Sequence, residues 1–208
     1  WCNGHFVGYC EDTFTPSDFD LTPYIRETGN RLCVQVHKRS SAAWLEDQDF
    51  FRFSGIFRPV FLYAAPKVED LWIQSVLNGD LTSGSIRFRF VTNASVHAKI
   101  SHPIDGVLFE GDLVLTDEGG YQFSQTIEFS KVRLWDYGTP ELYDVMLTVE
   151  GTTTEFIPYR TGFRRMEMGA DKIMYLNGKR LMINGVNRHE WNPENGRAVT
   201  MDDIRYIE

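Results

Sequence analysis

The strongest constraint in this 208-residue sequence is the alternation of apolar and polar residues between residues 70 and 165. Successive side chains of a β-strand point to opposite faces, so a period of two predicts one buried face and one solvated face. The pattern predicts strands near residues 70–77, 84–92, 95–101, 107–115, 121–129, 142–150 and 154–165. Short strands at this spacing favour an antiparallel β-sandwich of about 100 residues. The stretch has no cysteine, so Trp72 and Trp135 are expected to serve the core in place of a disulfide.

Turn-forming dipeptides separate these strands and recur in the flanking segments. They are Asn3-Gly4, Asn78-Gly79, Asp105-Gly106, Gly119-Gly120 and Asn177-Gly178. Asparagine and glycine both tolerate positive φ, so an Asn-Gly pair between strands favours a type I′ hairpin turn.

Residues 1–65 carry further strand-like patterns but no visible closure of a sheet. The first nine residues are typical of a hairpin, and Leu32, Val34 and Val36 alternate with their neighbours as in a half-buried strand. Pro66 is the expected boundary with the sandwich, because proline lacks the N–H that a sheet ladder uses.

The residues after the sandwich differ from it in pattern. A hairpin is expected between residues 174 and 183, and Leu181–Val186 is expected to form an apolar strand. Thr200, followed three residues later by Asp203, is typical of a helix N-cap. Because the sequence begins with Trp1 and ends about two turns into this helix, we expect it to be a piece of a longer protein, with any targeting signal outside it.

Composition excludes several classes of protein. The formal net charge of −8 argues against a nucleic-acid partner, since phosphate binding needs clustered Lys and Arg. The longest apolar runs are about five residues, far short of the roughly 18–20 that span a bilayer. The three cysteines, Cys2, Cys10 and Cys33, include no CxxC pair; a metal site with His5 is the less favoured interpretation, and free thiols, buried or half-buried, in a reducing cytoplasm are expected.

Two clusters could carry chemistry. Residues 44–58 place Glu46, Asp47 and Asp49 among aromatic residues. This fits either a solvated acidic turn or a sugar-binding site. In a sugar-binding site, carboxylates accept hydrogen bonds from the sugar hydroxyls, and aromatic rings cover the apolar face of the sugar. The second cluster, residues 187–192, is strongly polar and follows the expected strand 181–186. It fits either a surface loop or the active-site edge of an α/β barrel.

Four motifs in order resemble the bacterial β-galactosidases of glycoside hydrolase family 2. Residues 1–22 resemble the end of the family's jelly-roll sugar-binding domain, and residues 45–58 resemble its most diagnostic stretch. Leu134-Trp135 with residues 140–143 resembles a signature of its immunoglobulin-like domain. Residues 161–164, 176–179 and 185–190 resemble the entry into its catalytic barrel. The run Asp47-Gln48-Asp49 is typical of the galactosidase branch, whereas the glucuronidase branch keeps a similar Ser-Gly-Ile segment without it.

The resemblance implies roles for few residues. Asp49 matches an aspartate that binds the galactosyl 6-hydroxyl and a sodium ion, and His189 matches a histidine that contacts the sugar near the transition state. Asn187 and Arg188 are expected to neighbour that site. The family cleaves β-galactosides with retention, using two glutamates whose carboxyls lie about 5–5.5 Å apart. Those glutamates and the magnesium ligands are expected beyond residue 208, so none of the acids here takes those roles.

Together these observations predict a mostly β chain: residues 1–65 as the end of a jelly roll, 66–165 as an immunoglobulin-like sandwich, and 166–208 as the first elements of a (β/α)₈ barrel. The parent protein is expected to be a bacterial, cytoplasmic β-galactosidase that uses Mg²⁺ and Na⁺ and can form homo-oligomers. The fragment alone is expected to be inactive and to hold neither ion stably. The alternatives are a carbohydrate-binding module and a structural β-sandwich.

Overall fold

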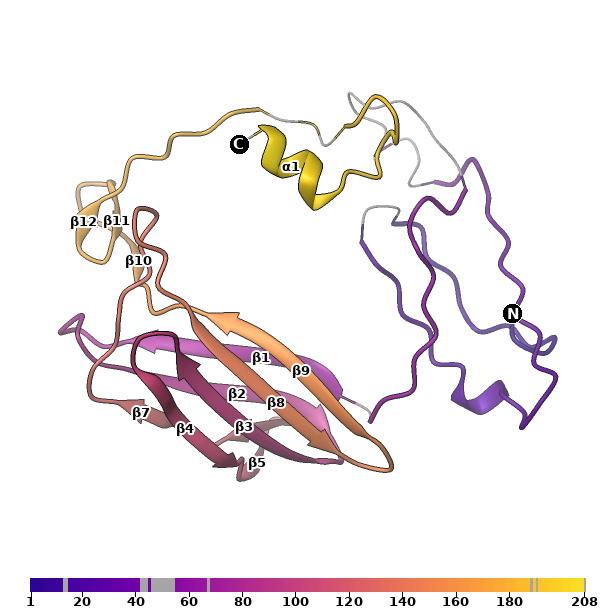
Figure 1. Cartoon of the computed structure of the whole chain (residues 1–208), viewed down its shortest axis with the longest axis horizontal. Helices are drawn as coiled ribbons and strands as arrows, with labels where there is room; N and C mark the ends of the chain where they lie inside the picture. The colour runs from indigo at the N-terminus through magenta and orange to yellow at the C-terminus, as the bar shows by residue number, and fades with distance from the viewer. Residues whose placement is uncertain are drawn as a thin grey trace. The chain divides into compact units, whose positions relative to one another are not determined.

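The computed structural model describes residues 1–12, 15–41, 45, 55–66, 68–187, 189 and 191–207, with backbone only for residues 206 and 207. The chain divides into two compact units. The first unit, here the split unit, joins Trp1–Phe61 to Gly185–Glu208, and the second, the sandwich unit, is Leu62–Asn184. The described chain is mostly β, as predicted, and its strands belong to the sandwich unit (Figure 1).

Residues 68–161 of the sandwich unit form two antiparallel sheets, drawn as two layers in Figure 1. One sheet has the order β1 (Val68–Leu77), β2 (Gly84–Thr92), β6 (Tyr121–Ser124) and β5 (Leu115–Glu118), and β7 (Ile127–Phe129) also pairs with β2. The other has the order β4 (Gly106–Asp112), β3 (Ser95–His102), β8 (Tyr143–Glu150) and β9 (Thr154–Thr161).

The alternation in the sequence becomes the alternation of burial that forms the core. On β2, Phe88 and Phe90 are fully buried while the intervening residues are half-buried. On β3 and β8, Ile100 and Leu147 are equally buried and belong to the same hydrophobic cluster. Two inner faces sharing one cluster confirm the expected immunoglobulin-like sandwich.

Two predicted strands are interrupted in the structure. The segment 107–115 breaks at residues 113–114 because the chain leaves β3, the partner of β4, and joins β6, the partner of β5. The segment 121–129 breaks because β6 and β7 pair with β2 in different registers, Arg89 with Phe123 but Ile86 with Ile127. At this break the Ser124 hydroxyl replaces a ladder bond by accepting from the Phe88 N–H at 3.0 Å.

The expectation that Trp72 serves the core is wrong. Its side chain points away from the core, and the Arg89 guanidinium lies 4.7 Å from the centroid of its ring. Trp135 is half-buried and packs against Gly162, while Arg164 lies 4.6 Å over its ring. The buried aromatic residues of the core are instead Phe88, Phe90, Phe129, Tyr143 and Phe163.

Most of the predicted tight turns form. Asn3-Gly4 and Asn177-Gly178 have positive φ at both residues, as a type I′ turn requires, and so does Gly119-Gly120 between β5 and β6. The prediction at Asn78-Gly79 is wrong. Positive φ falls on Leu81 there, because a wider loop closes through the Asn78 N–H donating to the Ser83 carbonyl.

A small three-stranded sheet follows the sandwich: β10 (Met166–Met168), β11 (Met174–Leu176) and β12 (Lys179–Arg180). The buried Asn177 ties it to the sandwich, donating to the Trp135 carbonyl at 3.0 Å and accepting from the Arg165 N–H at 2.9 Å. The expected strand 181–186 is absent, because no described residue forms a β-ladder with it, and Met182, Ile183 and Val186 are exposed.

The split unit has little regular structure in its described residues: η1 (Thr22–Tyr24), isolated bridges and α1 (Met201–Ile207). The expected strand at Leu32, Val34 and Val36 is wrong, since within the described residues only Leu32 makes a bridge, to Cys2, and all three side chains are exposed. All three cysteines are free thiols. Cys2 is buried as expected, whereas Cys10 and Cys33 are exposed on these irregular segments.

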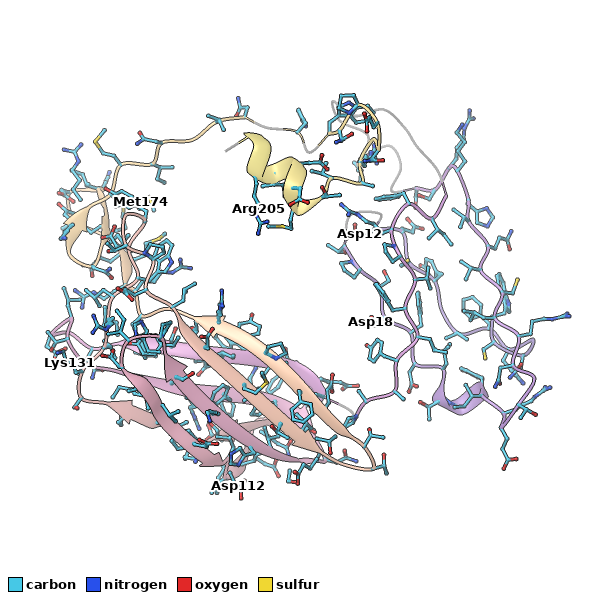
Figure 2. All side chains as sticks on the ribbon, viewed as in Figure 1. Asp12, Asp18, Asp112, Lys131, Met174 and Arg205 are labelled. Carbon is cyan, nitrogen blue, oxygen red and sulfur yellow. The ribbon has the colours of Figure 1, made fainter. Side chains whose placement is uncertain are left out.

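Helix α1 begins as the sequence predicts. The Thr200 hydroxyl accepts from the Asp203 N–H at 3.2 Å, and the Asp203 carboxylate accepts from the Thr200 N–H at 2.8 Å, which forms a reciprocal capping box. Donation by the Thr200 amide and hydroxyl and by Asn192 lowers the pKa of Asp203 below its ordinary value of 3.8. Arg205, labelled in Figure 2, is on the last turn of α1. Its Nη1 lies 3.5 Å from the Asp202 carboxylate.

No helix among the described residues is both long enough and apolar enough to cross a membrane.

Gly84→Ala is expected to destabilise the sandwich by about 1–3 kcal/mol, because overpacking a full core costs that much. A Cβ at residue 84 would lie 2.7 Å from the Val76 carbonyl oxygen and 2.8 Å from the Phe163 ring. Urea unfolding measures the change. Gly111→Ala is the matched control, since its Cβ would meet nothing closer than Phe109 at 3.6 Å. Equal stability of the two variants would contradict this packing.

The cap of α1 is expected to weaken in acid. The pKa of Asp203 is lower in the folded state than in the unfolded state. The stabilisation that its carboxylate gives to the cap is therefore fully present above the unfolded-state pKa, and it is lost as the pH falls through the folded-state pKa. Amide exchange of α1 followed from about pH 6 to pH 2 should show this loss in the wild type. Asp203→Asn should remove the transition, whereas Asp202→Asn should keep it. A wild-type cap indifferent to pH would refute the assignment.

Candidate functional site

Both clusters singled out in the sequence fall in the split unit. Its two parts, Trp1–Phe61 and Gly185–Glu208, contain residues 44–58 and 187–192 respectively. Asp49 and Arg188 lie outside the described residues, as do Glu46 and Asp47. Asn187 and His189 are described and exposed. The structure thus brings the two chain segments into one unit.

A direct link between the segments is made by Arg58. Its Nη2 donates to the carbonyl oxygen of Val199 at 3.0 Å and lies 3.5 Å from that of Arg197. The two partners of the shorter bond are 141 residues apart in the sequence. A hydrogen bond from a charged donor is stronger than a neutral one, so this contact is a defined junction between the two segments.

The arginine sits at the end of a short motif with a constrained backbone. Gly55 has φ +103°, a region that side chains other than hydrogen rarely allow, and nothing lies within 4 Å of a Cβ built there. A glycine at residue 55 therefore serves the backbone conformation rather than close packing. Residues 56–58 follow this turn as an irregular, exposed segment.

The segment after His189 is organised by one asparagine. The Asn192 side-chain oxygen accepts from the Glu194 N–H at 2.8 Å and the Asn195 N–H at 3.0 Å. Its amide nitrogen donates to the Asp203 carboxylate at 2.6 Å. Asn192, three positions after His189, therefore joins the start of this loop to the capping box of α1.

Sequence reasoning found the segments but not these contacts. Arg58 and Asn192 stand inside the two clusters, yet neither was distinguished from its neighbours as a structural link. The available signal was the Asn-Pro-Glu-Asn run at residues 192–195, since asparagine side chains commonly hydrogen-bond to the backbone two residues later. The partner of Arg58 had no such signal, because a carbonyl oxygen has no sequence signature.

The described residues do not assemble a metal centre. Among them, no group of three or more His, Cys, Asp or Glu side chains could hold an ion. The predicted sodium ligand, Asp49, lies outside the described part. None of the described residues therefore forms a binding site for Na⁺ or Mg²⁺, and no chemical step is assigned to either ion.

Comparison with protein-family models matches the chain in three consecutive parts. Residues 1–66 match the sugar-binding domain of glycosyl hydrolases family 2. Residues 67–164 match the model described as glycosyl hydrolases family 2, and residues 169–206 match the family's TIM barrel domain.

Curated relatives agree over the whole chain. The β-galactosidase large subunit of Lactobacillus acidophilus is 45% identical over 213 residues, covering 98% of this chain and 33% of that protein. The large subunit of Latilactobacillus sakei is 47% identical, with 98% and 33% covered. The chain spans about a third of the length of these relatives.

Among solved structures, the β-glucuronidase of Parabacteroides merdae matches with a TM-score of 0.64 at 28% identity, covering 77% of this chain and 22% of that one. Three models of one family, met in order along the chain, and relatives matched over 98% of this chain lead to one assignment. The chain belongs to glycosyl hydrolase family 2.

Proposed function

We propose that these residues act in a glycoside hydrolase that removes terminal β-galactose from β-galactosides. The observation that carries the proposal is the 45–47% identity to proteins named β-galactosidase large subunits over 98% of the chain. The acidic run Asp47-Gln48-Asp49 supports the same sugar, since carboxylates accept hydrogen bonds from sugar hydroxyls.

The proposed organisation is a jelly-roll part over residues 1–65, the sandwich over 66–165 and the start of a barrel over 166–208. The ranges of the three family models, 1–66, 67–164 and 169–206, support boundaries close to these. In the division into compact units, however, Gly185–Glu208 is grouped with the first part of the chain. Under the proposal, this grouping reflects barrel residues meeting jelly-roll residues at the sugar.

Asp49, Asn187, Arg188 and His189 are the proposed sugar-binding residues. Asp49 would accept a hydrogen bond from the galactosyl 6-hydroxyl and take part in a sodium site. His189 would contact the sugar ring as the glycosidic bond breaks. The Arg58 bond to the Val199 carbonyl supports this grouping, because it joins the segments that carry these residues. The proposed ions of the full-length protein are Na⁺, held in part by Asp49, and Mg²⁺, whose ligands are not proposed among these residues.

The proposed residues bind sugar but do not break the bond. Retaining hydrolysis needs one carboxylate to attack the anomeric carbon and a second carboxyl to protonate the departing oxygen. We propose that this pair is not among these 208 residues, and that they contribute binding energy that orients the galactoside. Because two of the relatives described above are named large subunits, association with another chain or a second copy belongs to the proposal.

A glucuronide substrate is the second candidate. It is favoured by the 28% identity to the Parabacteroides merdae enzyme, which is named a β-glucuronidase. A glucuronide carries a carboxylate where galactose carries the 6-hydroxyl, so Asp49 at that position would repel it. The acidic run therefore discriminates between the two candidates.

The purified 208-residue chain is expected to give no turnover of a chromogenic β-galactoside above a protein-free control. The physical reason is the missing pair of carboxyls, without which ground-state contacts cannot lower the barrier. Turnover that persists through repurification and disappears in Asp49→Asn would show that the catalytic pair lies within these residues.

A chimera tests the sugar assignment. These residues would replace the matching third of the Lactobacillus acidophilus large subunit. The chimera should hydrolyse a chromogenic galactoside at least about a hundredfold faster than the glucuronide, a difference of about 2.7 kcal/mol in activation free energy.

In that chimera, Asp49→Asn is expected to lower kcat/KM for the galactoside by about a hundredfold, because a charged acceptor for the 6-hydroxyl is lost. Asp117→Asn, an exposed position on β5, is the matched control and should change nothing. Equal activity of the two variants would overturn the proposed role of Asp49, and a preference for the glucuronide would overturn the galactoside proposal.

A further inference from the structure

We propose that Arg58 is a positioning residue: its guanidinium holds the loop 192–203 against the motif 55–58 and thereby places His189 for sugar binding. The inference deepens the proposed function and rests on it for the role of His189. The contact itself is a feature of the structure, with Nη2 at 3.0 Å from the Val199 carbonyl oxygen.

The Arg58 bond is made at a buried residue that directly precedes the cap of α1. Val199 is buried, with 8% of its surface exposed, and precedes the helix cap Thr200 directly. The same Nη2 lies 3.5 Å from the Arg197 carbonyl, so one guanidinium faces two outward carbonyls of the chain entering α1. An arginine offers several donors in a fixed plane, whereas a lysine ammonium offers a single mobile centre.

From Val199 the constraint passes along bonded residues to His189. The Thr200 cap and the Asp203 carboxylate bond to each other, and Asn192 donates to the same carboxylate at 2.6 Å. Asn192 also accepts from two amides of its own turn, which fixes its side chain. Asn192 is three positions after His189 in the sequence, so the imidazole is carried on a segment whose far end is anchored.

The two carbonyl oxygens that face Arg58 account for a cationic side chain at this position, although the chain as a whole is acidic. Val199 and Arg197 offer carbonyl oxygens, which accept hydrogen bonds from a positively charged donor and have no N–H or O–H of their own to donate. Loss of the guanidinium leaves the Val199 carbonyl without this partner and removes this link between the loop and the first segment. Local opening, rather than global unfolding, is the expected consequence, because the sandwich core lies in the other unit.

Amide hydrogen exchange of the 208-residue chain tests the link. Arg58→Met should speed exchange in residues 194–204 by about tenfold or more, with β2 and β8 unchanged, and Arg58→Lys should restore part of the protection. Arg31→Met is the matched control, since Arg31 is exposed in the same unit and its guanidinium has no hydrogen bond to another described residue. Unchanged exchange in Arg58→Met overturns the proposal, whatever the sugar experiments show.

Titration with galactose, followed by the imidazole proton resonances of His189, provides the functional readout. The wild type should show a saturable shift, Arg58→Met should weaken the affinity at least about fivefold, and Arg58→Lys should recover part of it. Faster loop exchange with an unshifted His189 resonance in the wild type would keep the Arg58 link but refute the proposed sugar contact. Faster exchange with unaltered galactose affinity would refute the positioning role alone.

Discussion

The burial of Phe163 is the interaction on which the sandwich unit depends. Its ring is fully buried, 5.0 Å from Tyr143 and 5.8 Å from Phe129 between ring centroids, and it fills the space that Gly84 leaves open. Its backbone carbonyl accepts from the Trp135 N–H at 2.9 Å. Residues from three parts of the chain therefore meet at one side chain. Aromatic pairs of this edge-to-face kind add to the free energy gained by burial alone. The small sheet of β10, β11 and β12 is attached beside it through Asn177.

Among its described residues, the split unit is connected by polar contacts rather than by a core of this kind. Cys2 and Val199 are its buried apolar side chains among the described residues. Hydrogen bonds of Asn3 and Arg58 connect segments distant in the sequence, and Asn192 bonds to Asp203 within the C-terminal segment. Such contacts are directional, so they fix geometry more than they add stability. A sugar-binding role benefits from this property, because sugar hydroxyls are recognised by accurately placed polar groups.

The parts of the fold that could be predicted are those with local signals. Alternation predicted the inner faces of β2, β3 and β8, and Thr200 with Asp203 predicted the start of α1. The breaks at residues 113–114 and 125–126 could not be predicted, because they depend on which sheet each strand joins. Trp72 was misplaced for a related reason: only the register of β1 against β2 sets it beside Arg89 on the outer face.

The candidate site shows the same division. The sequence marked both clusters, and the family resemblance proposed roles for Asp49, Asn187, Arg188 and His189. The bond from Arg58 to the Val199 carbonyl, which joins the two chain segments that contain the clusters, depends on tertiary structure and was not predicted. The proposed sugar site is tested most directly by a crystal structure, with galactose bound, of a protein that contains these 208 residues. We expect one pocket in which Asp49 and His189 both contact the same sugar. Galactose bound away from either residue, or the two side chains in separate cavities, would contradict it.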